Sequence, residues 1–237
     1  VGLGGDLTTQ SEAEEWLEAY KAGEKKTTSC CPGFVNLIRK HFPEFADMIS
    51  TTVSPMCMIS RLLKAKDPDC YTVFIGPCIS KKSEVKDQKI EGNADAVLTY
   101  SEIRAIMRAK DVQLEPAAND YQESSVFGKR YGNSGGVTDS VLEYMKETNQ
   151  ECDATVCKAN GAAECKKALL MLKAGKLSED FIEGMACVGG CVGGPSSYED
   201  QMKAKKNRDK LISEADDRTI IGNLKNYDLD SFSHHRD

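Results

Sequence analysis

The sequence predicts an α/β fold, with two lobes of mixed or parallel sheet flanked by helices. Short apolar segments alternate with amphipathic helical segments along most of the chain. A length of 237 residues suits one large domain or two lobes that share a core. We expect approximate lobes at 1–66 with 186–237, and at 67–185. Because such sheets place ligand sites beyond the carboxyl ends of their strands, the segments around Cys31, Cys78 and Cys187 are expected to converge at one site.

The first third of the chain is expected to be mostly helical. Residues 11–22 have a helical pattern that opens with a capping box, Ser11 followed by Glu14. A turn at TSCCPG leads to a short helix at about 34–41. Proline at the start of 55–66 favours another helix there.

From residue 71 onward, strands and helices alternate. The expected elements are strands at 71–78, 94–100, 153–159 and 181–187, helices at 101–111, 136–147, 162–175 and 198–216, and a glycine-rich loop at 128–136. The polar end, SFSHHRD, is expected to be mobile. The loop lacks the GxxxxGK[ST] pattern, so it is not a P-loop.

Composition and charge exclude several classes of function. The formal charge of −6 argues against nucleic-acid binding, which needs a basic surface. No apolar run is long enough to span a membrane. The opening residues, VGLGGDLTTQ, do not have the pattern of a signal peptide, so a cytoplasmic location is expected. They resemble the middle of a domain, which suggests a further segment upstream.

The chain contains ten cysteines, an unusually high number. Disulfides are not expected without an export signal, because the cytosol keeps thiols reduced. Metal or redox chemistry is therefore the leading interpretation. Some cysteines sit in apolar or helical patterns typical of small buried side chains: Cys57, Cys70, Cys152, Cys157 and Cys165.

The run MACVGGCVGGP is the strongest local indication of a metal site. Glycines around Cys187 and Cys191 let the backbone fold closely around a bulky group and direct N–H groups at it. Zinc is compatible with this spacing but usually needs a second close pair of ligands. Cys31 and Cys78 are isolated, which favours an iron–sulfur cluster held from several loops. A structural turn is the alternative.

Other residues have two interpretations each. Of the adjacent pair Cys30 and Cys31, one can be a ligand and the other a proton-carrying thiol or a packed side chain. Lys81, in GPCISKKSE, can donate to an anionic ligand or lie at a solvated surface. Glu12 and Glu15 can pass protons or form a solvated helical face. The histidines, at 41, 234 and 235, show no ligand spacing.

TSCCPGF, GPCISKKSE and EGMACVGGCVGG resemble, in order and context, the three signature motifs of the FeFe (iron-only) hydrogenases. GGDLTTQSEAEE, ISTTVSP, ADAVLTYSEI, GNSGGV and KANGAAE resemble connecting segments of the catalytic domain in that family. The resemblance extends from Gly4 to about residue 196. It implies reversible reduction of protons to H₂ at an H-cluster, which is a 4Fe–4S cluster joined to a diiron unit with carbon monoxide, cyanide and azadithiolate ligands.

The resemblance also implies that the cluster site lies between the two lobes, and it implies roles for individual residues. The cluster ligands would be Cys31, Cys78, Cys187 and Cys191, with Cys191 shared with the diiron unit. Protons would pass through Cys30, Ser50, Glu15 and Glu12. Lys81 would hydrogen-bond a cyanide. The other residues implied at the cofactor are Pro55, Met56, Gly76, Pro77, Tyr131, Gly132 and Met185.

Several residues depart from the family pattern. Gly76 replaces a methionine, Met56 a glutamine, Tyr131 a phenylalanine and Phe34 a tryptophan. Ala19 stands where the outer arginine of the proton relay is usual. These changes surround the ligands rather than alter them, and they resemble divergent hydrogenases of the sensory type.

The expected partners follow from the same resemblance. They are H₂ and protons, maturation proteins, and a ferredoxin-like electron donor or acceptor or an N-terminal iron–sulfur region outside this sequence. Neither nucleic acid nor a membrane is expected. The alternative function is a non-catalytic, hydrogenase-like iron–sulfur protein that takes part in iron–sulfur protein assembly, although Cys30 and Lys81 favour a hydrogenase. A structural zinc protein is the third possibility.

Overall fold

Two small parallel sheets organise the part of the chain that the computed structural model describes, residues 2–115 and 123–236. The larger sheet has the strand order β1-β5-β4, and the smaller one pairs β2 with β3. The strands are Lys26–Thr27 (β1), Val73–Gly76 (β2), Ala96–Thr99 (β3), Val156–Asn160 (β4) and Phe181–Met185 (β5). All pairs between these strands are parallel, which confirms the predicted α/β class.

Helices connect these strands and cover both faces of the larger sheet. The α-helices are Gly2–Ala22 (α1), Pro32–His41 (α2), Pro55–Lys66 (α3), Lys81–Glu84 (α4), Tyr100–Ala109 (α5), Val126–Arg130 (α6), Gly136–Glu147 (α7), Ala162–Lys173 (α8), Gln201–Ser213 (α9) and Ile220–Leu224 (α10). Short 3-10 helices span Pro43–Met48 (η1), Cys191–Gly193 (η2) and Leu229–Ser231 (η3). In the described part of the chain, no helix has the length and hydropathy to cross a membrane.

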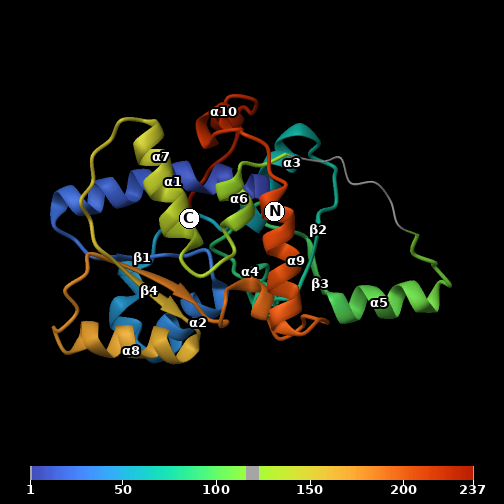
Figure 1. Cartoon of the computed structure of the whole chain (residues 1–237), viewed down its shortest axis with the longest axis horizontal. Helices are drawn as coiled ribbons and strands as arrows, with labels where there is room; N and C mark the ends of the chain where they lie inside the picture. The colour runs from blue at the N-terminus through green and yellow to red at the C-terminus, as the bar shows by residue number, and fades with distance from the viewer. Residues whose placement is uncertain (1, 116–122, 237) are drawn as a thin grey trace.

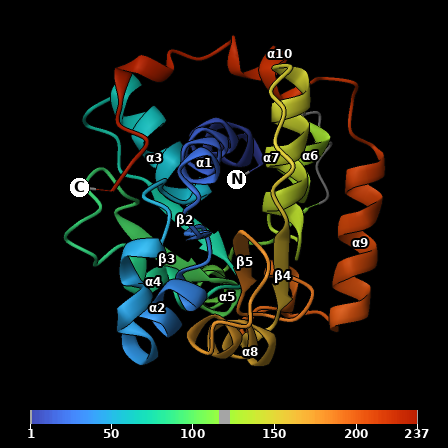
Figure 2. The same ribbon diagram turned by 90° about the vertical axis from the view of Figure 1, so that its left-hand side faces the viewer.

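The larger sheet lies between two helical layers (Figures 1 and 2). Helices α1 and α7 lie on one side of it, and α2 and α8 on the other. Strand β5 is buried along its whole length, and its one charged residue, Glu183, accepts hydrogen bonds from the N–H groups of Gly135 and Thr138. Trp16 of α1 stacks on Phe181 of β5 at 4.4 Å between ring centroids. On the opposite face, a Cβ at Gly184 would lie 2.4 Å from the Phe34 ring, so only glycine fits there.

Helix α1 begins at Gly2, not at Ser11 as the capping pattern predicted. Ser11 lies inside the helix, and its hydroxyl pairs with the Thr52 hydroxyl at 2.8 Å. Glycines are poor helix formers, but here they allow close packing. A Cβ on Gly4 would lie 2.2 Å from the carbonyl oxygen of Pro55. Tertiary contact therefore extends the helix through a segment that local propensity disfavours.

The polar end of the chain was expected to be mobile. Its described residues are instead hydrogen-bonded to the segment around residue 52. His235 forms an antiparallel bridge with Thr52. The Val53 N–H donates to the carbonyl of His234 at 2.9 Å, and the Arg236 N–H donates to Thr51 at 2.7 Å. Polar composition could not reveal these long-range backbone hydrogen bonds.

The expected division into two lobes stays a prediction. Strand β1, from the first third of the chain, pairs with β5, which in turn pairs with β4. A boundary between the expected lobes would therefore run through the larger sheet. The smaller sheet, with α4 and α5, lies to one side of it (Figure 1).

Candidate functional site

A cavity of about 470 Å³ lies beyond the carboxyl ends of β2 and β5. A volume of this order is typical of cofactor and ligand sites. Thirteen of the residues singled out in the sequence line it: Cys30, Cys31, Pro55, Met56, Gly76, Pro77, Cys78, Lys81, Tyr131, Gly132, Met185, Cys187 and Cys191. Glu12, Glu15 and Ser50 do not line it. The parallel strands thus bring together segments that are far apart in the sequence.

Cys31 and Cys78 each follow a strand. Cys31 occupies the N-cap position of α2 with an extended backbone, and Pro32 begins the helix. The Ala186 N–H points at the Cys31 sulfur from 3.5 Å. Cys78 follows β2 directly after Gly76 and Pro77, and burial raises the pKa of its thiol. The strand ends therefore direct two isolated cysteines to one cavity.

Glycines shape the loop that carries Cys187 and Cys191. Gly189 and Gly190 have φ values of +78° and +83°, which favour glycine. A Cβ on Gly190 would lie 2.2 Å from the Gly132 carbonyl oxygen. That same oxygen accepts a hydrogen bond from the Cys191 N–H at 2.8 Å. The Gly-Gly-Cys run therefore packs tightly against the short segment 131–135, which connects α6 and α7.

The cysteine side chains are close enough to interact electrostatically. Burial, followed by the neighbouring Cys31 and Cys78, raises the pKa of Cys187 to about 11 and that of Cys191 to about 12. Cys191 has accessible surface because it faces the cavity, although protein surrounds it. The raised pKa values mean that deprotonating these thiols is unfavourable. Since metals bind the thiolate form, a cationic metal group would offset the free energy of deprotonation.

The lining is compatible with a bulky iron–sulfur group, because four thiols from separate loops share one cavity. Within residues 2–115 and 123–236, no three His, Cys, Asp or Glu side chains are grouped closely enough to bind one ion. A zinc ion would need its sulfur ligands at about 2.3 Å. The four thiols instead surround a shared cavity. Tyr131 lines the cavity, and its buried hydroxyl has no hydrogen-bond partner in the structure, so this hydroxyl is available as a donor.

Lys81 points toward the cavity from the start of α4. Its ammonium group donates to Ser54 Oγ at 2.7 Å and to Glu84 Oε2 at 2.6 Å. Burial alone would lower the pKa of Lys81, but the Glu84 carboxylate raises it above its usual value. Lys81 therefore stays charged. Ser54 and Glu84 were not singled out from the sequence, although Glu84 stands three residues after Lys81, a recognisable helical ion-pair spacing.

Phe74 gives a physical reason for glycine at position 76. A Cβ on Gly76 would lie 2.7 Å from the Phe74 ring. Phe74 and Tyr100, neither of which was identified from the sequence, both line the cavity. An aromatic side chain thus occupies the space where the family pattern has a methionine.

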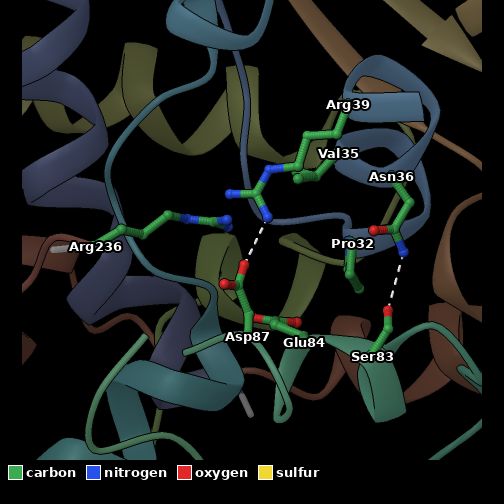
Figure 3. A pocket seen from close by; sticks show the side chains of 8 residues that line it. All are labelled: Pro32, Val35, Asn36, Arg39, Ser83, Glu84, Asp87 and Arg236. Atoms are coloured by element: carbon green, nitrogen blue, oxygen red, sulfur yellow. Dashed lines mark hydrogen bonds and ion pairs between the residues drawn. The ribbon is translucent and has the colours of Figure 1, made fainter. Parts of the chain in front are cut away.

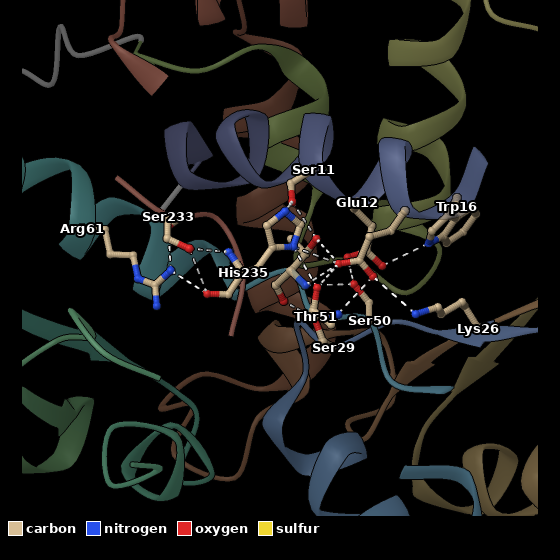
Figure 4. A network of polar contacts seen from close by, with 12 residues as sticks. Ser11, Glu12, Trp16, Lys26, Ser29, Ser50, Thr51, Arg61, Ser233 and His235 are labelled. Carbon is tan, nitrogen blue, oxygen red and sulfur yellow. Dashed lines mark hydrogen bonds and ion pairs between the residues drawn. The ribbon is translucent and has the colours of Figure 1, made fainter. Parts of the chain in front are cut away.

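A second polar network, which includes Glu12, Ser50 and His235 (Figure 4), lies close enough to Cys30 for Glu12 to affect its thiol. Glu12 is completely buried and accepts hydrogen bonds from Trp16 Nε1 at 3.1 Å and Ser50 Oγ at 2.9 Å. Glu15 accepts from the Thr51 N–H at 3.0 Å and lies 3.2 Å from His235 Nδ1. The structure therefore joins Glu12, Ser50 and Glu15, as proposed from the sequence, and adds His235.

The two carboxyl groups differ in charge state. Burial, followed by repulsion from Glu15, raises the pKa of Glu12 to about 8. Burial would raise the pKa of Glu15 as well, but hydrogen bonds with His235 and Thr51 lower it to about 2. Burial, with contributions from Cys31 and Glu12, raises the pKa of Cys30 well above its usual value. At neutral pH the network therefore contains a protonated acid beside an ionised one.

A smaller cavity of about 190 Å³ lies next to α4 (Figure 3). Arg39 spans it and binds Asp87 at 2.6 Å. Buried atoms of two lining residues, Glu84 Oε1 and Arg236 Nε, have no hydrogen-bond partner. This cavity shares Glu84 with the Lys81 ion pair, and none of Cys31, Cys78, Cys187 and Cys191 lines it.

The fold and the site define an α/β protein with a cysteine-lined cavity at the carboxyl ends of parallel strands. Residues 1–195 match the family described as iron only hydrogenase large subunit, C-terminal domain. The chain belongs to this family. The resemblance seen in its sequence motifs is thereby confirmed.

Individual relatives include hydrogenases and assembly factors. Iron hydrogenase 1 of Clostridium pasteurianum is 26% identical over 82% of this chain and 42% of its own length. The cytosolic Fe-S cluster assembly factor NAR1 of Kluyveromyces lactis is 25% identical over 76% of this chain and 53% of its own. The chain thus spans about half the length of these relatives. An apo FeFe-hydrogenase variant of Chlamydomonas reinhardtii shares the fold with a TM-score of 0.68, at 21% identity over 94% of this chain and 76% of that one.

Proposed function

We propose that this chain is a hydrogenase catalytic domain that interconverts protons, electrons and H₂. The observation that carries the proposal is one cavity lined by four cysteine thiols together with Cys30 and Lys81. The fourfold thiol set suits an iron–sulfur cubane, and Cys191 would be the thiolate shared with a diiron unit. When bound, this cofactor supplies the redox chemistry and the site at which hydrogen is bound.

The side chains of the cavity have complementary tasks. The Lys81 ammonium, held by Glu84, would donate to an anionic ligand of the cofactor. The Cys30 thiol gives protons to the cofactor or takes them from it, and its raised pKa keeps it protonated at neutral pH. Pro55, Met56 and Met185 supply apolar surface that excludes water.

Behind Cys30, the polar network stores and conducts protons. Glu12 is buried and protonated near neutral pH, so it can resupply a proton to the thiol. Ser50 hydrogen-bonds Glu12 and connects it to Glu15. Electrons come from a ferredoxin-like partner or from a region outside this sequence, and maturation proteins insert the diiron unit. The departures at Gly76, Met56 and Tyr131 resemble divergent hydrogenases of the sensory type, so the same chemistry can serve either H₂ sensing or turnover.

The second candidate function is assembly of iron–sulfur proteins without hydrogen chemistry. Relatives that include the assembly factor NAR1 support it. A protein without a diiron unit needs no proton-carrying thiol at position 30 and no cation directed at a cofactor ligand from position 81, although Lys81 also balances the Glu84 carboxylate. Retention of both, side by side at the cavity, favours the hydrogenase.

Infrared spectroscopy of anaerobically matured protein separates the two functions. A hydrogenase shows carbon monoxide and cyanide stretching bands together with iron and H₂ evolution. A cubane spectrum without those bands supports the assembly function and contradicts the proposal. Protein that binds no iron after the same treatment contradicts both.

A further inference from the structure

His235 reaches the polar network from a distant part of the sequence. The His234 carbonyl accepts a hydrogen bond from Val53, and Arg61 Nη1 donates to the carbonyls of Ser233 and His235 at 2.6 and 2.8 Å. The backbone around the imidazole is therefore held on both sides. Figure 4 shows the ring beneath α1, turned toward Thr51 and the acidic network.

The imidazole continues the hydrogen-bonded chain outward. His235 Nδ1 lies 2.8 Å from Thr51 Oγ1 and 3.2 Å from Glu15 Oε1. Nε2 lies 3.3 Å from Ser11 Oγ. The exposed fraction of the side chain is 46% for His235 and 11% for Glu15, while Glu12 is fully buried. Side-chain exposure thus rises stepwise along this hydrogen-bonded series, from Glu12 through Glu15 to His235.

The family resemblance places an outer arginine of the proton relay at position 19. In this chain the position is Ala19, which is buried and carries no ionisable group. We propose that His235 takes over the solvent end of this path and exchanges protons between water and Glu15. The inference rests on the proposed function. For each proton that the imidazole accepts from water, it releases one through Nδ1 to Glu15, and Ser50 and Glu12 carry it toward Cys30. In the opposite direction every transfer reverses.

The charged surroundings suit this task. His235 faces Glu15 and Glu14 of α1, Arg61 of α3 and the neighbouring His234. Lys26 of β1 lies 3.9 Å from Glu15, and Arg236 adjoins the ring in the chain. The Glu15 hydrogen bond outweighs burial and the cations, so the pKa of His235 lies above its usual value. An imidazole ordinarily titrates near neutral pH, where both of its protonation states are accessible.

The test measures proton movement at Glu12 without using enzyme activity. In the whole chain, the infrared carboxyl band of Glu12, assigned with Glu12→Gln, shifts when deuterium from D₂O replaces its proton. With His235→Ala, we expect this exchange to slow by about 100-fold, the order of effect of a positioned acid–base group. Added imidazole should restore it.

Two matched variants distinguish proton transfer through His235 from a purely structural role of its side chain. His235→Asn keeps a hydrogen-bonding group near Glu15 but cannot carry a proton, so it should be as slow as His235→Ala. His234→Ala removes the neighbouring histidine, which contacts the Leu229 carbonyl instead, and should exchange at the wild-type rate. Wild-type exchange in His235→Ala, or full recovery in His235→Asn, overturns the proposal.

The Glu12 exchange rate and the infrared bands of the cofactor are separate measurements, so a failure of the His235 assignment can be distinguished from a failure of the proposed function. If matured protein lacks carbon monoxide and cyanide bands, the proposed function fails, yet the Glu12 exchange still reports on His235. If those bands are present and His235→Ala exchanges normally, only the assignment of His235 fails. In matured protein, His235→Ala should also flatten the pH dependence of H₂ evolution around the pKa of the imidazole.

Discussion

Lys81 and Glu84 form a buried ion pair, with 2.6 Å between Nζ and Oε2, directly at the edge of the cysteine-lined cavity. Their side chains are 11% and 2% exposed, so solvent screens the pair weakly. The adjacent lysine, Lys82, instead forms an exposed pair with Glu102. Two consecutive residues of one helix thus provide a test and its control.

Lys81→Ala should destabilise the fold because it leaves the Glu84 carboxylate buried without a counter-charge. Removing one partner of a buried pair typically costs about 3–5 kcal/mol. We expect a loss of this order in the free energy of unfolding, measured by urea denaturation of the iron-free protein. Lys82→Ala should change it little, because exposed pairs contribute little. Equal effects of the two substitutions would contradict the buried pair.

Cys30→Ala should separate proton transfer from cofactor binding. The variant removes the proposed proton carrier but none of the four proposed cluster ligands. H₂ evolution should fall by about 100-fold or more, while iron content and infrared bands stay those of the wild type. Cys165→Ala, which changes a buried cysteine of α8 outside the cavity, should retain activity. Unchanged H₂ evolution in Cys30→Ala would remove that thiol from the path.

Cys191→Ser tests the assignment of the shared ligand. Serine is a poor ligand for iron in place of a thiolate, so the diiron unit should be lost. The carbon monoxide and cyanide bands should disappear after maturation, and iron content should fall. Cys157→Ser, in β4 and away from the cavity, should leave both unchanged. A normal diiron spectrum in Cys191→Ser would refute the assignment.

Glu12→Gln should change how stability depends on pH. The pKa of Glu12 is raised from 4.5 to about 8 on folding, so between these values the unfolded chain has lost a proton that the folded chain retains. The wild type should therefore lose stability relative to the variant as pH rises through this range. The limiting slope for one proton is about 1.4 kcal/mol per pH unit.

Urea denaturation of both proteins at a series of pH values measures this difference. Above about pH 8 the two curves should run parallel, because Glu12 is then ionised in both states of the wild type. Glu15→Gln is a control with the opposite pH dependence of stability. The pKa of Glu15 is lowered to about 2, so the stability that it contributes should be lost as pH falls from 4.5 toward 2. Parallel curves for wild type and Glu12→Gln throughout would mean that Glu12 is not buried as an acid.

The sequence correctly indicated the fold class and the family, since both depend on local patterns. Alternating apolar strands and helices predicted the α/β class, and three short cysteine motifs carried the family resemblance. Elements decided by long-range packing were missed or misplaced. Strand β1 is only two residues long and exists because it pairs with β5. Helix α1 runs through a glycine-rich start because neighbouring backbone packs against it.

For the candidate site, the sequence by itself determined which residue types were available and in which order they occur. Only the tertiary structure decided that Cys31, Cys78, Cys187 and Cys191 face one cavity, because parallel pairing aligns strand ends that lie far apart along the chain. The contact between Glu15 and His235 spans 220 positions of sequence. Local spacing carries no information about such a contact, since backbone pairing at Thr52 and hydrogen bonds from Arg61 bring the imidazole to the acid.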